Sequence, residues 1–405
     1  MAFDNSADLG PGGTDLRAAL HGDAVWRGFL RSSIGQLHRR LAGRLSFRHH
    51  RLLRRGLVGR RGAGHRRRHR ALAHRRQGRG PPRSDPGALG GIVTSAGPRW
   101  LDQRLAAGEI VIIDGGVGTE LEARGAVMDE GAWCGPANLE AGELLSQIHS
   151  DYIAAGADVV IANTFAAGRQ ALEPSGFGKQ VVEINRRAVE YAVQARDRAE
   201  REVAVAGAIS HFIAHDAGAE WRQPERLAAC FREQAETQAE AGADLIALEM
   251  MQRLEYAEAA MAAAQTTGLP VWLGLCARRA PEGTGFVSFA EPPYAIEPMF
   301  AAADRLGAGL VTVMHSDVDV TAALLDLLQP HWSGPTGVYP ESGYFEMPHW
   351  QFIDIISPAD LAVEAERWIA AGCQVIGGCC GIGVAHIAKL KQALPSHLPG
   401  RQGGS

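Results

Sequence analysis

Residues 149–165 read HSDYIAAGADVVIANTF, and this stretch contains the unit from which the fold is built. An amphipathic helix is expected over Glu140–Ala155, because leucine, isoleucine and tyrosine recur there at helical spacing. Gly156 follows, where a glycine in the left-handed conformation ends many helices. The apolar run Val159–Phe165 then predicts a strand that is buried on both faces, as in parallel sheets.

The same unit recurs along the chain. Eight apolar runs predict strands at Ile110–Gly116, Val159–Phe165, Val203–Ile209, Leu245–Met250, Val271–Cys276, Leu310–His315, Gly337–Ser342 and Val375–Cys380. Amphipathic stretches predict helices at Glu140–Ala155, Val181–Arg201, Pro224–Ala241, Leu254–Thr267, Ala322–Leu328 and Pro358–Ala371. Alternation of strand and helix over eight repeats predicts an α/β fold, the (β/α)8 TIM barrel. A doubly wound sheet is the alternative, because the pattern does not show whether the sheet closes.

Charge divides the chain into two unequal regions. The 405 residues have a formal net charge of −4. Residues 1–97 contain 20 Arg, no Lys and five Asp, a net charge of +15, whereas the remainder has 21 basic and 40 acidic residues, a net charge of −19. We therefore expect an Arg-rich extension over 1–97, a barrel over 98–396 and a tail over 397–405.

The extension is expected to be disordered, because a run without acidic residues from Val25 to Ser84 repels itself and buries little apolar surface. Three interpretations stay open. The start codon could be assigned too early, with the native start near Val93; the segment could be an organelle transit peptide; or it could bind nucleic acid phosphates. The first is favoured, because Arg-rich sequence without Lys is typical of GC-rich DNA translated out of frame. Nucleic acid binding is disfavoured, because aromatic residues that stack on bases are nearly absent.

Composition excludes several classes of protein. A hydrophobic share of 46% with 6% aromatic residues is too apolar for a disordered chain. No run approaches the roughly 18 consecutive apolar residues of a membrane helix. Six cysteines in a chain of this length form no disulfide framework. They indicate a reducing compartment, for which the cytoplasm is the expectation.

Polar and reactive side chains gather where the predicted strands end. They are Asp114, Gly115 and Gly116 after the first strand, Asn163 and Thr164 after the second, Glu249 after the fourth, His315 after the sixth, Glu341 and Ser342 after the seventh, and residues 377–381 after the eighth. The carboxyl ends of barrel strands meet on one face, where barrel enzymes carry their active sites. A functional site is therefore expected on that face.

Cys379 and Cys380 are adjacent and flanked by glycines, which let the chain turn sharply. The small ring that a disulfide between neighbours would close is strained. Two thiolates and a further nitrogen or sulfur donor form a zinc site with one open position. His315 is the best candidate for the third donor, and Cys276 is the other. Two buried cysteines beside a tight turn, without a metal, are the alternative.

These motifs resemble the homocysteine S-methyltransferase family over residues 105–395. The resemblance rests on DGGVGTEL at 114–121, HSDYIAAGAD at 149–158, NTF at 163–165, YPESG at 339–343 and GGCCG at 377–381. The YPESG run is similar to a Tyr-Pro-Asn-x-Gly segment of the family. The resemblance implies a (β/α)8 barrel and a zinc ion held by three cysteines, two of which match Cys379 and Cys380.

The resemblance also implies a reaction and a set of substrate contacts. A methyl group would pass from a small onium donor (S-methylmethionine, S-adenosylmethionine or betaine) to homocysteine, giving methionine. Asp114 and Glu249 would lie near the ammonium of homocysteine, and the backbone of Gly115 and Gly116 near the substrate. Thr164 is the matching residue after the second strand. The expected partners are homocysteine and the donor, with no membrane and no nucleic acid.

One position departs from the family pattern. Where the family has Gly-x-Asn-Cys, this chain has Thr312-Val313-Met314-His315, so His315 stands in place of a cysteine ligand. A site of two cysteines and one histidine suits zinc, but one thiolate fewer makes it one unit more positive. The alternative is a zinc-free homologue that binds a small amino acid or thiol without methyl transfer. Trp133 and Phe165 are candidates to hold an onium group by cation–π contact.

Overall fold

The structure is a computed structural model that describes residues 97–400 apart from 215–216, 282 and 291. The predicted extension, except for Gly97, and the last five residues of the tail lie outside the described residues. The three interpretations of the extension therefore stay predictions.

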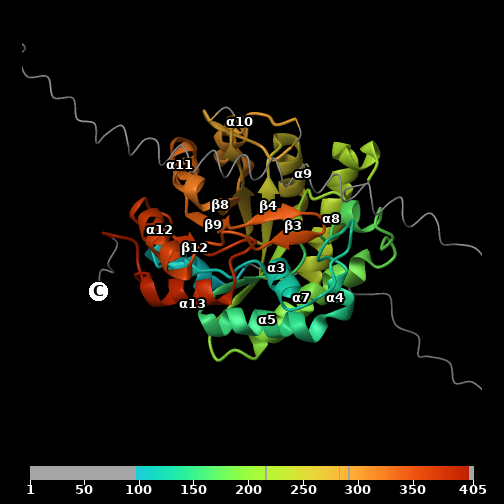
Figure 1. The fold of residues 1–405 in the computed structure, drawn as a ribbon, viewed down its shortest axis with the longest axis horizontal. Coiled ribbons are helices and arrows are strands. Elements are labelled where there is room, and N and C mark those ends of the chain that lie inside the picture. Colours follow the sequence, from blue (N-terminus) through green and yellow to red (C-terminus); the bar gives the residue numbers. More distant parts are fainter. Residues whose placement is uncertain (1–96, 215–216, 282, 291, 401–405) are drawn as a thin grey trace, which may run out of the picture. The chain divides into compact units, whose positions relative to one another are not determined.

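Eight parallel strands form a single sheet that closes into a barrel (Figure 1). They are β1 Val111–Ile112, β2 Val159–Ile161, β3 Ala204–Ser210, β4 Leu245–Met251, β5 Val271–Leu275, β8 Leu310–Asp317, β9 Thr336–Glu341 and β12 Val375–Ile376. Their order is β1-β12-β9-β8-β5-β4-β3-β2, and a parallel bridge between Ile113 and Val159 joins the two ends. The predicted (β/α)8 barrel is confirmed, and the doubly wound sheet is wrong.

A buried carboxylate reinforces the seam between β1 and β2. Both strands are short, so few backbone hydrogen bonds join them. The amide of Asp114 donates to the carbonyl of Val159 at 3.1 Å, and Oδ2 of Asp114 accepts a hydrogen bond from the amide of Ile161 at 2.8 Å. The first of the predicted strand-end carboxylates therefore helps to close the barrel.

Helices cover the outside of the barrel (Figure 1). The six predicted helices are found, to within about one turn, as α5 Gly142–Ala155, α7 Val181–Asp197, α8 Pro224–Glu240, α9 Leu254–Gln265, α11 Val318–Leu328 and α12 Pro358–Ala370. Helices that were not predicted are α2 Arg99–Ala107, α3 Val117–Ala123, α4 Ala137–Glu140, α6 Arg169–Leu172, α10 Glu297–Ala301 and α13 Val384–Ala393. No helix in the described part of the chain is long and apolar enough to cross a membrane.

Shorter elements complete the description. Within the described residues, 3-10 turns cover Ala219–Arg222, Asp304–Leu306 and Gln329–His331. Two hairpins lie outside the barrel sheet: β6 Arg278–Arg279 with β7 Phe286–Val287, and β10 Tyr344–Glu346 with β11 His349–Gln351. The second hairpin follows β9 and contributes to the site described below.

Three helix ends carry the predicted left-handed glycines. Gly156, Gly242 and Gly372 have φ values of 111°, 101° and 93°. After α5 the amide of Gly156 donates to the carbonyl of Ile153 at 3.0 Å, which satisfies a carbonyl of the last turn. The glycine thereby turns the chain from the helix into the following strand.

Apolar side chains fill both sides of the strands. Alternate residues of β3, Ala204, Ala206 and Ala208, belong to a cluster with side chains from other strands, inside the barrel. The residue between the first two, Val205, belongs to the larger cluster between the sheet and the helices. Burial on both faces explains why the strands appear in the sequence as continuous apolar runs.

Candidate metal centre

A bulge at the end of β8 aims His315 into the barrel mouth. β8 pairs with β9 in regular register up to Met314, and the register shifts before Asp317. His315 has a φ of 42°, in the left-handed region, where histidine is found more often than most residues. Because a bulge redirects the side chain it carries, the strand can end in a histidine that faces the site.

Cys379 and Cys380 lie in a tight loop after β12. The amide of Cys379 donates to the carbonyl of Pro340 at 2.8 Å, and the carbonyl of Cys380 accepts from the amide of Ser342 at 2.9 Å. Gly381 has a φ of 77°, and a Cβ atom there would lie 1.8 Å from the carbonyl oxygen of Ser342. The glycine after the pair is therefore required by both conformation and space.

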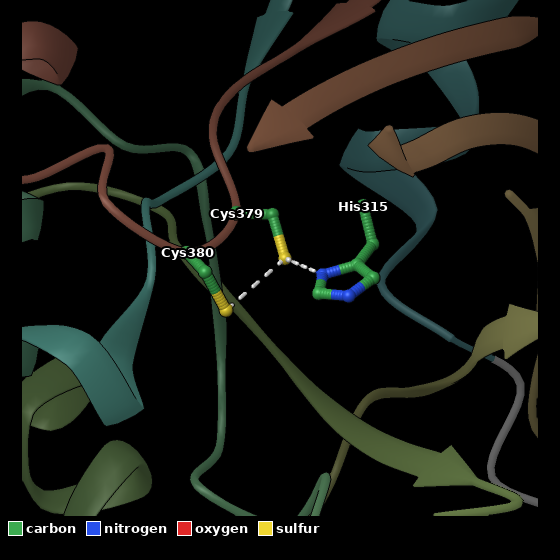
Figure 2. Close-up of side chains that lie close together, drawn as sticks. All are labelled: His315, Cys379 and Cys380. Atoms are coloured by element: carbon green, nitrogen blue, oxygen red, sulfur yellow. Dashed lines mark hydrogen bonds between the residues drawn. The ribbon is translucent and has the colours of Figure 1, made fainter. Parts of the chain in front are cut away.

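The structure brings the three predicted ligands together (Figure 2). Nδ1 of His315 lies 3.6 Å from Sγ of Cys379, which lies 3.9 Å from Sγ of Cys380. All three donor atoms are within 4.8 Å of one another, the spacing of a metal site. Tetrahedral zinc, with bonds of about 2.0–2.3 Å, needs donors roughly 3.5–4 Å apart. Cys276, the other candidate, is not a member of this group.

The two thiols are not arranged as nucleophiles. The hydrogen bond with Cys380, together with burial, raises the pKa of Cys379 well above its usual range. The same contact lowers the pKa of Cys380, but burial and nearby carboxylates raise it overall. Reactive cysteines have lowered pKa values. A cation shared by both sulfurs would supply the positive charge that this environment lacks, so the site fits a metal better than nucleophilic catalysis.

A second bulge, in β4, positions Glu249. The register with β5 shifts between Leu248 and Met251, and Met250 has a φ of 58°. Glu249 is only 6% exposed. Burial raises its pKa to about 7, although His315 and a hydrogen bond from Tyr339 act to lower it.

Asp114 interacts with Glu249 electrostatically. Burial raises the pKa of Asp114 well above its usual range, against the hydrogen bond from Ile161, and the charge of Glu249 raises it further. Oδ1 of Asp114 has no hydrogen-bond partner. Two buried carboxylates, of which Glu249 raises the pKa of Asp114, favour a ligand that brings a positive charge.

The three candidate ligands His315, Cys379 and Cys380, called the metal group below, line a cavity at the carboxyl end of the barrel. About 60 Å³ of it is open to the centre of a water molecule, room for a few water-sized groups. Six of the eight predicted site residues line it: Gly115, Gly116, Glu249, His315, Cys379 and Cys380. The space suits a small ligand.

Thr164 and Asp114 are the two predicted site residues that do not line the cavity. Oγ1 of Thr164 lies 2.8 Å from both the amide and the carbonyl of Ala208, accepting from one and donating to the other. It thus links β2 to β3. A substrate contact by either residue stays a prediction.

Aromatic side chains lie around the cavity and His315, and only two of them were predicted from the sequence. Trp133 and Phe165 line the cavity as edge-to-face neighbours with ring centroids 6.2 Å apart. The imidazole of His315 also has the rings of Phe289 and Trp350 at 5.5 and 6.5 Å. Neither of these two was predicted. Phe289 follows the two-residue strand β7, and Trp350 lies in the three-residue strand β11, so neither segment is long enough for a periodicity that would indicate which way its side chain points.

Known proteins share both the sequence and the fold of this chain. The sequence model described as homocysteine S-methyltransferase matches residues 111–394. The chain is 29% identical over 320 residues to homocysteine S-methyltransferase 2 of Zea mays, covering 71% of this chain and 92% of the relative. It is also 29% identical over 313 residues to homocysteine S-methyltransferase of Escherichia coli strain K12, covering 70% and 94%.

A solved structure extends the likeness to the fold. It is the homocysteine methyltransferase MmuM from Escherichia coli in its metallated form, which covers 73% of this chain and 98% of its own, with a TM-score of 0.57 and 24% identity. The family match spans well over half of the chain, from β1 to the end of α13. The chain therefore belongs to the homocysteine S-methyltransferase family.

Proposed function

We propose that this chain is a zinc-dependent methyltransferase that moves a methyl group from a small onium donor to the thiol of homocysteine, giving methionine. One observation carries the proposal: a histidine and two cysteines converge within 4.8 Å on a cavity at the carboxyl end of the barrel. The family membership of the chain supports the same reaction.

His315, Cys379 and Cys380 would hold the metal. Zinc, when bound, lowers the pKa of a substrate thiol, so that the reactive thiolate is present at neutral pH. The chain's own task is then to hold that sulfur and the donor methyl group in line. The bulge at His315 and the backbone hydrogen bonds of the cysteine loop would fix the three donors at the ends of β8 and β12, the two strands that flank β9.

Glu249 would hold the ammonium group of homocysteine. Its carboxylate is buried at the cavity wall with a pKa raised to about 7. A bound ammonium would stabilise the ionised form and so lower that pKa. Gly115 and Gly116, which have no side chains, let the substrate approach the backbone of the wall.

Methyl transfer balances without a further reagent. The thiol of homocysteine loses its proton to solvent, and its sulfur forms a bond to the methyl carbon. The bond between that carbon and the positive sulfur or nitrogen of the donor breaks, and its electron pair stays on that atom, which becomes uncharged as the demethylated donor leaves. Trp133 and Phe165, on the cavity wall, would hold the positive donor by cation–π contact.

The cysteines support a reducing compartment, and we place the protein in the cytoplasm. All six are free thiols, including the adjacent pair. A metal site of two thiols requires them reduced, which oxidising compartments do not maintain.

Metal analysis and a donor panel test the proposal together. The purified full-length chain should contain about one zinc per molecule and form methionine from homocysteine with at least one of the three donors. Cys230→Ser provides a control, because Cys230 lies in α8 and outside the metal group. Absence of zinc after growth with added metal, together with no turnover of any donor, would overturn the proposed function.

A further inference from the structure

A carboxylate stands beside the histidine of the metal group. Glu341 ends β9, the neighbour of β8 in the barrel, and is 7% exposed. Its Oε2 lies 2.8 Å from Nδ1 of His315. Nδ1 is also the ring nitrogen that faces Cys379 in Figure 2. One nitrogen therefore has the sulfur of Cys379 and the carboxylate of Glu341 as its neighbours.

Nδ1 cannot serve a metal and Glu341 at the same time. A nitrogen that binds a metal carries no proton, so it has no hydrogen to donate to a carboxylate. The present contact is close enough for an ion pair, yet Oε2 makes no well-directed hydrogen bond within the described part of the chain. Once a metal takes Nδ1, the carboxylate loses this neighbour as a proton donor, and a buried carboxylate without a cation is costly. The cation that displaces the proton is the partner that removes this cost.

The charges of the donors also favour a role for Glu341 at the metal. Two thiolates and a neutral imidazole balance a divalent cation to zero, whereas three thiolates leave one negative charge. Against the patterns that the family resemblance implies, His315 stands in place of a cysteine and Glu341 in place of the neutral asparagine of Tyr-Pro-Asn-x-Gly. The two departures are in contact. Together they move one negative charge from the end of β8 to the end of β9.

We propose that Glu341 is a fourth donor of the metal centre, which then consists of two cysteines, one histidine and one glutamate. The inference rests on the proposed zinc function. Glu341 stands at the edge of the group, because it is not among the three residues whose donor atoms are mutually within 4.8 Å. An oxygen donor on a flexible side chain is also a weaker partner for zinc than a thiolate. Of the four donors, Glu341 is therefore the one that the sulfur of homocysteine would displace from the metal.

The isosteric variant Glu341→Gln tests this on the full-length chain. Its apparent zinc Kd, measured by competition with a chromogenic chelator, should rise at least about tenfold. With Co²⁺ in place of zinc, the visible d–d bands should shift. Asp317→Asn is the matched control, because it removes a nearby negative charge opposite Glu341 in the register with β9. It should change the Kd less than about twofold and leave the bands in place.

A thiol titration separates ligation from mere positioning of His315. Homocysteine should bind the Co²⁺-loaded Glu341→Gln variant more tightly than the wild type, seen as a near-ultraviolet thiolate-to-cobalt band, because an internal competitor is gone. Unchanged or weaker thiol binding, or the same gain in Asp317→Asn, would overturn the assignment of Glu341 as a donor. Wild-type protein that takes up neither Zn²⁺ nor Co²⁺ would overturn the proposed function as well, whereas metal uptake that Glu341→Gln leaves unaltered overturns this inference alone.

Discussion

The two halves of the proposed metal centre are held in different ways. The loop of Cys379 and Cys380 is tied to the end of β9 by backbone hydrogen bonds and matches the family motif. The other half, His315 at the bulge of β8 with Glu341 beside it, depends on side-chain contacts and departs from the motif. The cysteine loop, which backbone hydrogen bonds hold, requires particular residues. The half that contains His315 and Glu341 depends on side chains, so other metal-binding side chains can replace them.

The largest effect is expected in the backbone-held half. Cys379→Ser or Cys380→Ser replaces a thiolate by a hydroxyl, a poor zinc ligand, and should weaken zinc binding by about a thousandfold or more with loss of methyl transfer. Zinc per chain by mass spectrometry, beside Cys230→Ser, measures this. Full metal content in either variant would show that the pair does not bind the metal.

Gly381→Ala should lower the stability of the fold for two reasons. The new Cβ would collide with the carbonyl oxygen of Ser342, and residue 381 has a left-handed backbone conformation that alanine rarely adopts. We expect a loss of about 3 kcal/mol or more in the free energy of unfolding, measured with urea. Gly125→Ala separates strain from collision: Gly125 has a φ of 91°, but nothing lies within 4 Å of the added carbon. Its expected cost is about 1 kcal/mol. Equal losses in both variants would show that the contact with Ser342 does not matter.

The side-chain half should tolerate exchange of its donor. His315→Ala removes a proposed ligand and should raise the zinc Kd about a hundredfold, whereas His315→Cys, which gives the cysteine that the family resemblance implies, should preserve or increase affinity. Chelator competition on both variants measures the difference. Unchanged zinc binding in His315→Ala would break the comparison, because the metal would then depend on the cysteine loop alone.

The smallest effect concerns Glu249 in metal-free protein. Burial raises its pKa from an ordinary 4.5 to about 7. Between those values the folded chain binds more protons than the unfolded one, so stability falls as pH rises. Between pH 5 and pH 7.5, the free energy of unfolding of Glu249→Gln should therefore fall by about 2 kcal/mol less than that of the wild type. Urea unfolding at both pH values, with a chelator present, checks it. Parallel pH dependence in wild type and variant would show that Glu249 does not titrate in this range.

The sequence predicted the strands because burial on both faces leaves a continuous apolar run, and it predicted six helices because their apolar stripes are long. It missed α13, whose buried side chains are only His386, Ile387 and Leu390, and the hairpin of β10 and β11, which has too few residues for a period. Neither element has a hydrophobic periodicity long enough for it to be predicted.

For the site, position along the strands sufficed to find His315 and the cysteine pair. The contact between His315 and Glu341 could not be predicted, because it depends on a register shift of β8 that no residue type announces. Thr164 shows the opposite error, since a residue at a strand end can face the neighbouring strand instead of the cavity. Sequence identifies which residues reach the mouth of a barrel more reliably than it identifies what each one touches there.

The hydrogen bond of Asp114 across the seam between β1 and β2 offers a way to detect a ligand in the cavity. Its Oδ2 accepts the amide of Ile161 across the joint between the first two strands, while Oδ1 remains unpaired. We therefore expect the exchange of that single amide with deuterium to depend on the charge of Asp114, whose pKa the charge of Glu249 raises. A cationic ligand that ionises these carboxylates should slow the exchange at Ile161, so that one backbone proton would register occupancy without any turnover.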